Sequence, residues 1–184
     1  MKLRWICVFC GARAGVSERY TAHVREFAQA IVHQGIGLVY GGASVGLMGT
    51  LADAVLAAGG ECIGVIPQGL VEQEIADPGL TRQIVTTSLS ERKACMTELS
   101  DAFVTLPGGA GTLDELSEFW TTAQLGLHRK PIGILNSEGY FDFLLRFFDR
   151  AIADGFIDAR DRELLSVERT SQALLDALVR QALD

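Results

Sequence analysis

A glycine-rich turn followed by two acidic residues is the part of this sequence best suited to chemistry. It reads Pro107-Gly108-Gly109-Ala110-Gly111-Thr112-Leu113-Asp114-Glu115 and separates an apolar run from an amphipathic segment. Glycines let backbone N–H groups approach an anion closely, and the N-terminus of a following helix adds partial positive charge. The turn therefore predicts a phosphate or nucleotide site with an acid beside it. An apolar run, a glycine turn and a helix can also be plain structure.

Glu115 itself has two interpretations. Thr112 and Glu115 have the Thr-x-x-Glu spacing of a capping box, in which the glutamate is purely structural. Glu118 follows three residues later on nearly the same helical face, so a pair of carboxylates for acid and base catalysis is equally available. The spacing alone does not choose between a cap and a catalytic acid.

Two adjacent cations form a second candidate group. Ser88 and Glu91 have the spacing of a capping box, which places Arg92 and Lys93 near the start of a helix over residues 88–100. Cations there oppose the helix dipole by about 0.3–1 kcal/mol per exposed charge, so an anionic ligand would compensate them. Arg92 could fork onto a phosphate or carboxylate, whereas Lys93 would act as a point charge. A solvated surface pair is the equal alternative.

Strands and helices that alternate along the whole chain position these residues. Strands are expected at 5–9, 36–40, 61–66, 82–86, 102–106, 132–135 and 164–167, and helices at 17–34, 46–58, 88–100, 113–125, 140–153 and 171–183. This alternation predicts an α/β fold, a Rossmann-like doubly wound parallel sheet flanked by helices on both faces. The length of 184 residues fits one nucleotide-binding domain over residues 1–184.

A second glycine turn, Gly41-Gly42-Ala43-Ser44-Val45-Gly46-Leu47-Met48-Gly49, follows the second expected strand. Both turns then lie at the carboxyl ends of parallel strands, where open α/β sheets bind ligands. Gly41, Gly42 and Gly46 are the candidate phosphate-binding residues of this turn. Its spacing differs from the dinucleotide fingerprint, and no Gly-Lys-Ser or Gly-Lys-Thr ending of a nucleoside triphosphatase is present.

The composition narrows the class of partner. A formal net charge of −7 argues against a nucleic-acid backbone or an anionic membrane as the main partner. We recognise neither a cleavable leader nor a membrane-spanning run, and so expect a cytoplasmic protein. Cys7 and Cys10 have the Cys-x-x-Cys spacing of one half of a zinc site, but the sequence has no second ligand pair. We therefore interpret both cysteines as small buried residues with free thiols. We expect no metal site.

Taken together, Gly41–Gly49, Glu91-Arg92-Lys93 with Met96, and Pro107–Glu115 closely resemble the Lonely Guy family. These proteins are cytokinin riboside 5′-monophosphate phosphoribohydrolases, long mislabelled as lysine decarboxylases. The resemblance covers nearly the whole chain and implies a Rossmann-like homodimer. It further implies hydrolysis of the N-glycosidic bond of an adenine-type nucleoside 5′-monophosphate, either AMP or a cytokinin riboside 5′-monophosphate. The products are the free base and ribose 5-phosphate, and no cofactor is required.

The resemblance also assigns roles to residues. Arg92 and Glu115 match the catalytic pair, and a carboxylate beside the ribose would stabilise the positive charge of the breaking bond or activate water. The substrate-contacting positions, besides that pair, are Glu74, Lys93, Gly109, Ala110, Gly111, Thr112, Leu113, Asp114 and Thr121. Ala43 departs from the family, because many relatives carry a third glycine there.

Two other functions fit parts of the pattern. Lysine decarboxylation needs a lysine that binds pyridoxal phosphate, and only Lys2, Lys93 and Lys130 exist. A non-catalytic nucleotide-binding protein or molybdenum-cofactor carrier needs the glycine turns but not the arginine–glutamate pair. For the expected homodimer, the apolar helix containing Phe119 and Trp120 is a candidate interface, with core packing as the alternative use of each residue.

Overall fold

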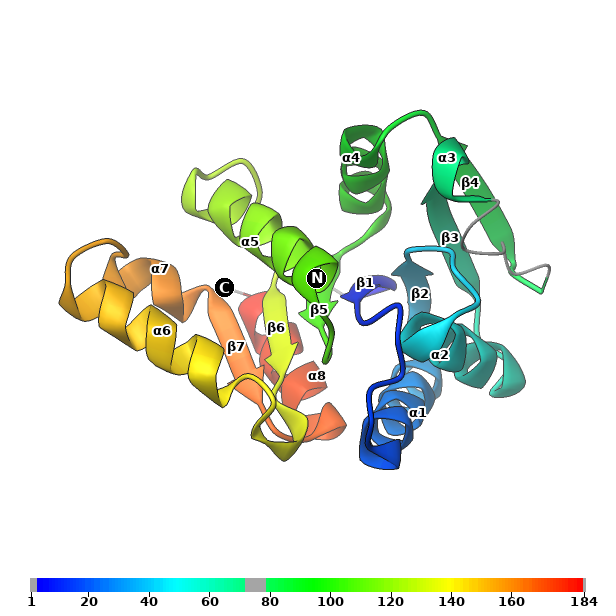
Figure 1. Ribbon diagram of the computed structural model, residues 1–184, viewed down its shortest axis with the longest axis horizontal. Helices are drawn as coiled ribbons and strands as arrows, with labels where there is room; N and C mark the ends of the chain where they lie inside the picture. The colour runs from blue at the N-terminus through cyan, green and yellow to red at the C-terminus, as the bar shows by residue number, and fades with distance from the viewer. Residues whose placement is uncertain (1–2, 72–78, 184) are drawn as a thin grey trace.

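The computed structural model describes residues 3–71 and 79–183. Within these residues, seven parallel strands form one sheet in the order β4-β3-β2-β1-β5-β6-β7 (Figure 1). The strands are β1 (Trp5–Phe9), β2 (Gly37–Tyr40), β3 (Cys62–Pro67), β4 (Arg82–Thr86), β5 (Ala102–Thr105), β6 (Ile132–Leu135) and β7 (Leu165–Glu168). Strands β2, β3, β5 and β6 are buried along their whole length, as expected of a parallel sheet covered on both faces.

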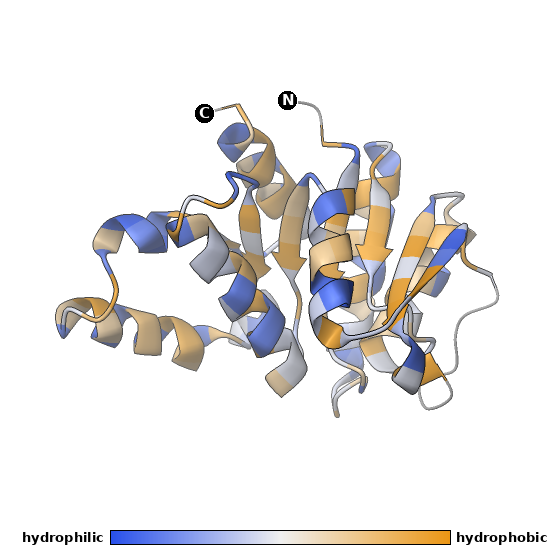
Figure 2. Cartoon of the chain, turned by 90° about the horizontal axis from the view of Figure 1, so that it is seen from above, coloured by the Kyte–Doolittle hydropathy of each residue, from blue (hydrophilic) through white to orange (hydrophobic). Residues whose placement is uncertain are grey.

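Helices cover both faces of the sheet (Figures 1 and 2). One layer holds α1 (Glu18–His33), α2 (Gly46–Ala57) and α8 (Ser171–Gln181), and the other holds α4 (Leu89–Leu99), α5 (Ala110–Gln124) and α6 (Asp142–Ala153). The short helices are α3 (Gln68–Val71), α7 (Ala159–Glu163) and the 3-10 helix η1 (Ser137–Gly139). The expected doubly wound α/β fold is confirmed. Among the described helices, none has the length and apolar content needed to cross a bilayer.

The face covered by α5 has an aromatic core. The ring centroid of Phe119 lies 4.9 Å from that of Phe9 and 4.3 Å from that of Phe103. Trp120 packs against Phe148 at 4.7 Å, and its indole N–H donates to the carbonyl of Asp161. Phe119 and Trp120 are 2% and 6% exposed, so core packing, the alternative use of each residue, is confirmed.

Helix α5 begins three residues earlier than the sequence predicts. Its N-cap is Gly109, and its first intrahelical bond runs from the N–H of Leu113 to the Gly109 carbonyl at 3.1 Å. Thr112 is therefore a buried residue of the first turn and not a cap. With Gly109 as the N-cap, the acid of a capping box would stand at position 112, and Glu115 lies about one turn farther along the helix. The interpretation of Thr112 and Glu115 as a capping box is therefore wrong.

The strand order reverses direction between β1 and β5. From β1 the sheet continues through β2 and β3 to β4, and from β5 it continues through β6 to β7. At the carboxyl ends of the two central strands, Phe9 is paired in register with Thr105. The loops that leave these strands diverge to opposite faces, which opens a crevice where doubly wound sheets bind ligands.

Candidate active site

A cavity of about 460 Å³ lies at this reversal point. Its walls come from the loop after β1 (residues 10–15), the first turn of α2 and the turn that leads into α5, together with Arg92 and two tyrosines. Two backbone hydrogen bonds join these walls. The N–H of Gly11 donates to the Pro107 carbonyl at 3.0 Å, and the N–H of Leu47 donates to the Gly11 carbonyl at 2.9 Å. The loop after β1 therefore connects the two glycine turns.

The turn into α5 offers bare backbone to the cavity. A Cβ atom on Gly108 would lie 2.1 Å from the Thr112 hydroxyl oxygen, so the turn is closed by a residue that must be glycine. Added Cβ atoms on Gly109 and Gly111 would meet no atom within 4 Å, and both residues line the cavity. The N–H groups of Ala110, Gly111 and Thr112 precede the first intrahelical bond and point outward from the helix start. Such an end can hold a phosphate.

The second glycine turn supports the cavity from behind. Gly41, Gly42 and Gly46 are not among the described residues that line it. A Cβ on Gly41 would lie 2.2 Å from Nη2 of Arg92, and a Cβ on Gly46 would lie 2.3 Å from the backbone of Ala12. These glycines thus make room for the arginine and for the loop after β1, whereas the sequence predicts that they hold the phosphate themselves.

Some residues next to those glycines line the cavity, and others pack against the sheet or in the core. Leu47 and Met48, in the first turn of α2, are the ones that reach the cavity. Gly42 adopts φ 76° and packs against the backbone of Gly64 and Val65 in β3. Ala43 is fully buried, and its methyl group packs in the core.

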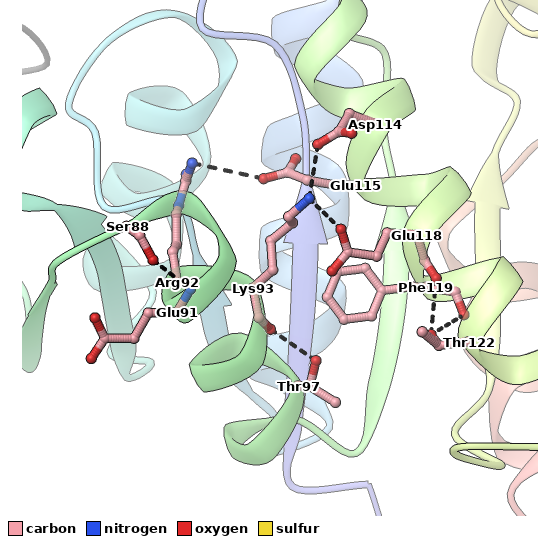
Figure 3. A network of polar contacts seen from close by, with 10 residues as sticks. All are labelled: Ser88, Glu91, Arg92, Lys93, Thr97, Asp114, Glu115, Glu118, Phe119 and Thr122. Carbon is pink, nitrogen blue, oxygen red and sulfur yellow. Dashed lines mark hydrogen bonds and ion pairs between the residues drawn. The ribbon is translucent and has the colours of Figure 1, made fainter.

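Arg92 is a buried cation with a fixed position. Its Nε donates to the Val65 carbonyl at 2.9 Å and its Nη2 to the Gly41 carbonyl at 3.2 Å. Its Nη1 lies 3.9 Å from Oε1 of Glu115 (Figure 3). Burying a charge is costly unless partners compensate it, and these three partners do so. Of the two interpretations for this residue, the solvated surface charge is excluded.

Lys93 also points to α5 (Figure 3), and it is not among the described residues that line the cavity. Its Nζ lies 3.1 Å from Oδ2 of Asp114 and also contacts the carboxylate of Glu118. The hydrogen bond that Lys93 donates to Glu118 raises the pKa of Lys93, and the bond that it donates to Asp114 adds to this rise. Lys93 therefore joins α4 to α5. Because Glu118 is bound to Lys93, it does not form the predicted carboxylate pair with Glu115.

Glu115 stands on the cavity wall with a side chain that is 14% exposed. Cys10 lines the same cavity, and burial together with the charge of Glu115 raises the pKa of its thiol well above the ordinary value. A thiol held in its protonated form is a poor nucleophile. Of the acidic side chains among the described residues, Glu115 is the one that lines the cavity, and Arg92 stands beside it.

The start of α4 confirms one half of its predicted capping box. The Ser88 hydroxyl accepts from the N–H of Glu91 at 3.1 Å. The carboxylate of Glu91 turns to Thr87 instead of Ser88, and accepts from its N–H at 2.7 Å and from its hydroxyl. These bonds lower the pKa of Glu91. The cap fixes the first turn of α4, from which Arg92 and Lys93 extend.

The remaining predicted contact residues that the structure describes do not line the cavity. Ala110, Leu113 and Asp114 are exposed in the first turns of α5 and are not among the lining residues. Thr121 is exposed further along the same helix, also outside the cavity. Glu74 lies outside the described residues.

Two parts of the wall are absent from the sequence-based site. Residues 11–15 form a third glycine-containing turn after a strand, a signal that the sequence does carry. Tyr140 carries no such signal, because it follows β6, 32 residues beyond Gly108 in the chain. Its hydroxyl donates to the Gly108 carbonyl at 2.6 Å, and its ring meets Tyr20 edge-on at 5.6 Å. The two tyrosines close one side of the cavity.

The side chains that a metal ion or pyridoxal phosphate would need have the following positions among the described residues. No group of three or more His, Cys, Asp or Glu side chains there is arranged for a metal ion. All four cysteines are free thiols, as expected. For pyridoxal phosphate, neither Lys93 nor Lys130 lines the cavity, and Nζ of Lys130 donates to the Thr97 carbonyl; Lys2 is not described.

The sequence is similar to plant enzymes over nearly its full length. A family model described as possible lysine decarboxylase matches residues 48–178. The cytokinin riboside 5′-monophosphate phosphoribohydrolase LOG5 of Arabidopsis thaliana is 42% identical over 177 residues, which is 96% of this chain and 78% of that protein. LOG1 of the same plant is 44% identical over 177 residues, covering 96% and 83%.

Solved structures with the same fold are more distant in sequence. The molybdenum cofactor binding protein of Rippkaea orientalis superposes with a TM-score of 0.73 at 20% identity, covering 100% of this chain and 99% of that one. The molybdenum cofactor carrier protein of Chlamydomonas reinhardtii gives 0.70 at 23%, covering 98% of both chains. At this identity the likeness concerns the fold alone.

Proposed function

This chain belongs to the family of cytokinin riboside 5′-monophosphate phosphoribohydrolases, and from that premise we propose the reaction that it catalyses. It hydrolyses the N-glycosidic bond of an adenine-type nucleoside 5′-monophosphate. Water adds its oxygen to C1′ of the ribose, the bond between C1′ and the base nitrogen breaks, and a proton goes to the departing base. The products are the free base and ribose 5-phosphate.

The observation that carries the proposal is the position of Glu115 and Arg92 on one cavity wall, next to the start of α5. With the phosphate on the N–H groups of that helix start, the ribose lies toward the carboxylate. Glu115 stabilises the positive charge that develops on the sugar, or takes a proton from the attacking water. Arg92 orients the carboxylate and the substrate.

The other substrate contacts carry over from the family resemblance. The backbone of Gly109, Ala110 and Gly111 with Thr112 holds the phosphate, and Leu113 and Asp114 complete that turn. We propose that Lys93 acts largely by holding α5 in place through Asp114 and Glu118. Thr121 and Glu74 stay predictions of direct contact, and phosphate binding by Gly41, Gly42 and Gly46 also stays a prediction.

A carrier function is the rival that uses the same fold. A carrier needs the glycine turns but no acid beside them, whereas Glu115 is held at the cavity by a buried arginine whose burial must be compensated. This pair therefore favours hydrolysis. Four free cysteines are typical of a reducing compartment, which supports a cytoplasmic site of action.

We further propose that the enzyme is a homodimer that pairs through the outer face of α6. Phe143 and Phe147 lie one helical turn apart on that face and are 80% and 63% exposed, and Phe156 just beyond the helix is 85% exposed. Large aromatic side chains gathered on one exposed face mark an association surface. A second copy with the same face forms a closed, symmetric contact. The side chains of Phe119 and Trp120 are buried in the core, so the exposed aromatic side chains of α6 are the ones that we propose for this contact.

The proposed reaction is tested by incubating the protein with AMP, with isopentenyladenosine 5′-monophosphate and with adenosine, and by separating free base from nucleotide. We expect base release from both monophosphates and little from adenosine, and the faster monophosphate identifies the preferred base. Binding of AMP without any base release would instead support the carrier.

A further inference from the structure

We propose that Arg13 binds the 5′-phosphate of the substrate and thereby selects nucleoside 5′-monophosphates over nucleosides. This inference rests on the proposed hydrolase function and adds a residue that lies outside the predicted site. Arg13 is an exposed residue of the loop after β1, and it lines the same cavity as Gly108, Gly109 and Gly111 of the α5 turn.

The loop that carries Arg13 is held against both glycine turns, by Arg13 itself at the start of α2 and by Gly11 at the turn into α5. A Cβ on Gly46 would lie 2.4 Å from the Arg13 nitrogen, so the loop packs directly onto the start of α2. On the other side, the N–H of Gly11 donates to Pro107, and a Cβ on Gly108 would lie 2.9 Å from the Gly11 nitrogen. The Arg13 side chain therefore starts from a fixed position beside the turn that leads into α5.

Among the charged residues that line the cavity, Arg13 is the one whose charge is available to an anionic ligand. The charged side chains that line the cavity are Arg13, Arg92 and Glu115. Arg92 and Glu115 offset each other at 3.9 Å. Arg13 has no carboxylate within ion-pair distance in the described part of the chain. In a protein with a net charge of −7, it gives the cavity a local positive charge.

A phosphate monoester is the ligand that this charge fits. Such a group carries about −1.5 to −2 charge at pH 7, whereas a helix N-terminus supplies only about +0.5. The start of α5 alone thus leaves most of the phosphate charge uncompensated, and Arg92 is already engaged by Glu115. A guanidinium also matches phosphate oxygens in a bidentate fork. Arg13 supplies both the missing charge and the donors.

The test compares Arg13→Ala and Arg13→Lys with the parent enzyme on AMP and on adenosine. We expect the KM for AMP to rise about tenfold in Arg13→Ala with kcat within about twofold, because the contact is equal in ground and transition states. The KM of Arg13→Lys lies between those of the parent and Arg13→Ala, since lysine keeps the positive charge and loses the bidentate hydrogen bonds. Any activity on adenosine stays unchanged. Equal KM values for AMP in parent and Arg13→Ala would overturn the proposal.

A control and a binding measurement separate this proposal from the function on which it rests. Arg25→Ala removes the same charge from an exposed position on α1, away from the cavity, and leaves the KM unchanged. Calorimetric titration with ribose 5-phosphate needs no turnover, and the Kd rises about tenfold in Arg13→Ala. If the parent released no base, the hydrolase proposal would fail. If the Kd did not change, the role of Arg13 would fail.

Discussion

Nη1 of Arg92 faces Oε1 of Glu115 at 3.9 Å, and the two residues come from different helices on the same side of the sheet. The guanidinium is anchored by carbonyls of Val65 in β3 and of Gly41 just after β2. Glu115 is therefore positioned by a cation that the sheet itself holds. The geometry of this pair depends on backbone that lies outside the cavity.

Substitution of Gly41 by alanine tests that dependence. The added Cβ would lie 2.2 Å from Nη2 of Arg92 and 2.9 Å from the sulfur of Met48, so the guanidinium must move. We expect kcat for base release to fall about 100-fold, because an Å-scale misplacement of a catalytic group has that effect. Steady-state kinetics with AMP measures it.

The matched control for that substitution is Gly69→Ala. A Cβ at Gly69 would meet no atom within 4 Å, and the residue lies in the short helix α3. This variant keeps kcat within about twofold while thermal unfolding shows both proteins folded. Full activity of the Gly41 variant would contradict the positioning role assigned to that glycine.

Substitution of Lys93 by glutamine removes the link between α4 and α5. We expect a loss of about 1 kcal/mol and a Tm lower by about 2–4 °C at pH 7, because Asp114 and Glu118 then repel each other on one helical face. The folded state raises the pKa of Lys93 above its ordinary value of 10.5. The protonated lysine therefore stabilises the fold fully below that value, and the contribution disappears as pH rises through the raised pKa.

Thermal unfolding of parent and Lys93→Gln from pH 7 to pH 12 measures this effect. The difference in Tm stays constant up to about pH 10 and shrinks above it. Arg150→Gln is the control, because Arg150 pairs with Asp154 on an exposed surface and an arginine keeps its charge over this range. A difference that grew with pH would rule out the assigned ion pairs.

The outer face of α6 predicts the oligomeric state. Phe147→Glu places a charge in the middle of the exposed aromatic face, so we expect light scattering to change from the mass of two chains to that of one, 19.8 kDa. Leu127→Glu is a control outside that helix, at a residue that is 72% exposed. A parent protein that is already monomeric at micromolar concentration would exclude the proposed dimer.

The fold could be predicted because each element is locally consistent. Ser17 caps α1 with its hydroxyl, and Gly35, which follows the helix, adopts φ 69°. Buried apolar runs separated by amphipathic helices leave few alternatives to a parallel sheet. The sequence predicts a start of α5 that is too late, because the Thr112–Glu115 spacing resembles a capping box, whereas the N-cap is Gly109, which has no side chain.

The site could be predicted only in part. The Arg92 and Glu115 motifs are local in sequence, so their residues were found. The wall formed by Tyr140 depends on a loop that is held against α1, where Glu138 at φ 54° accepts from Arg19 at 2.7 Å. Contacts between segments so far apart in the chain follow from the packing of helices and not from a motif. For the same reason, the sequence alone does not predict the buried position of Arg92.

The most direct test of the account is base release from AMP by Glu115→Gln, measured by chromatography beside the parent enzyme. The amide keeps the shape of the side chain but cannot stabilise a cationic sugar or take a proton. We predict a fall in kcat of at least about 1,000-fold with a Kd for AMP within about threefold of the parent value. Release of base at the parent rate would contradict the catalytic role of Glu115 and with it the proposed mechanism.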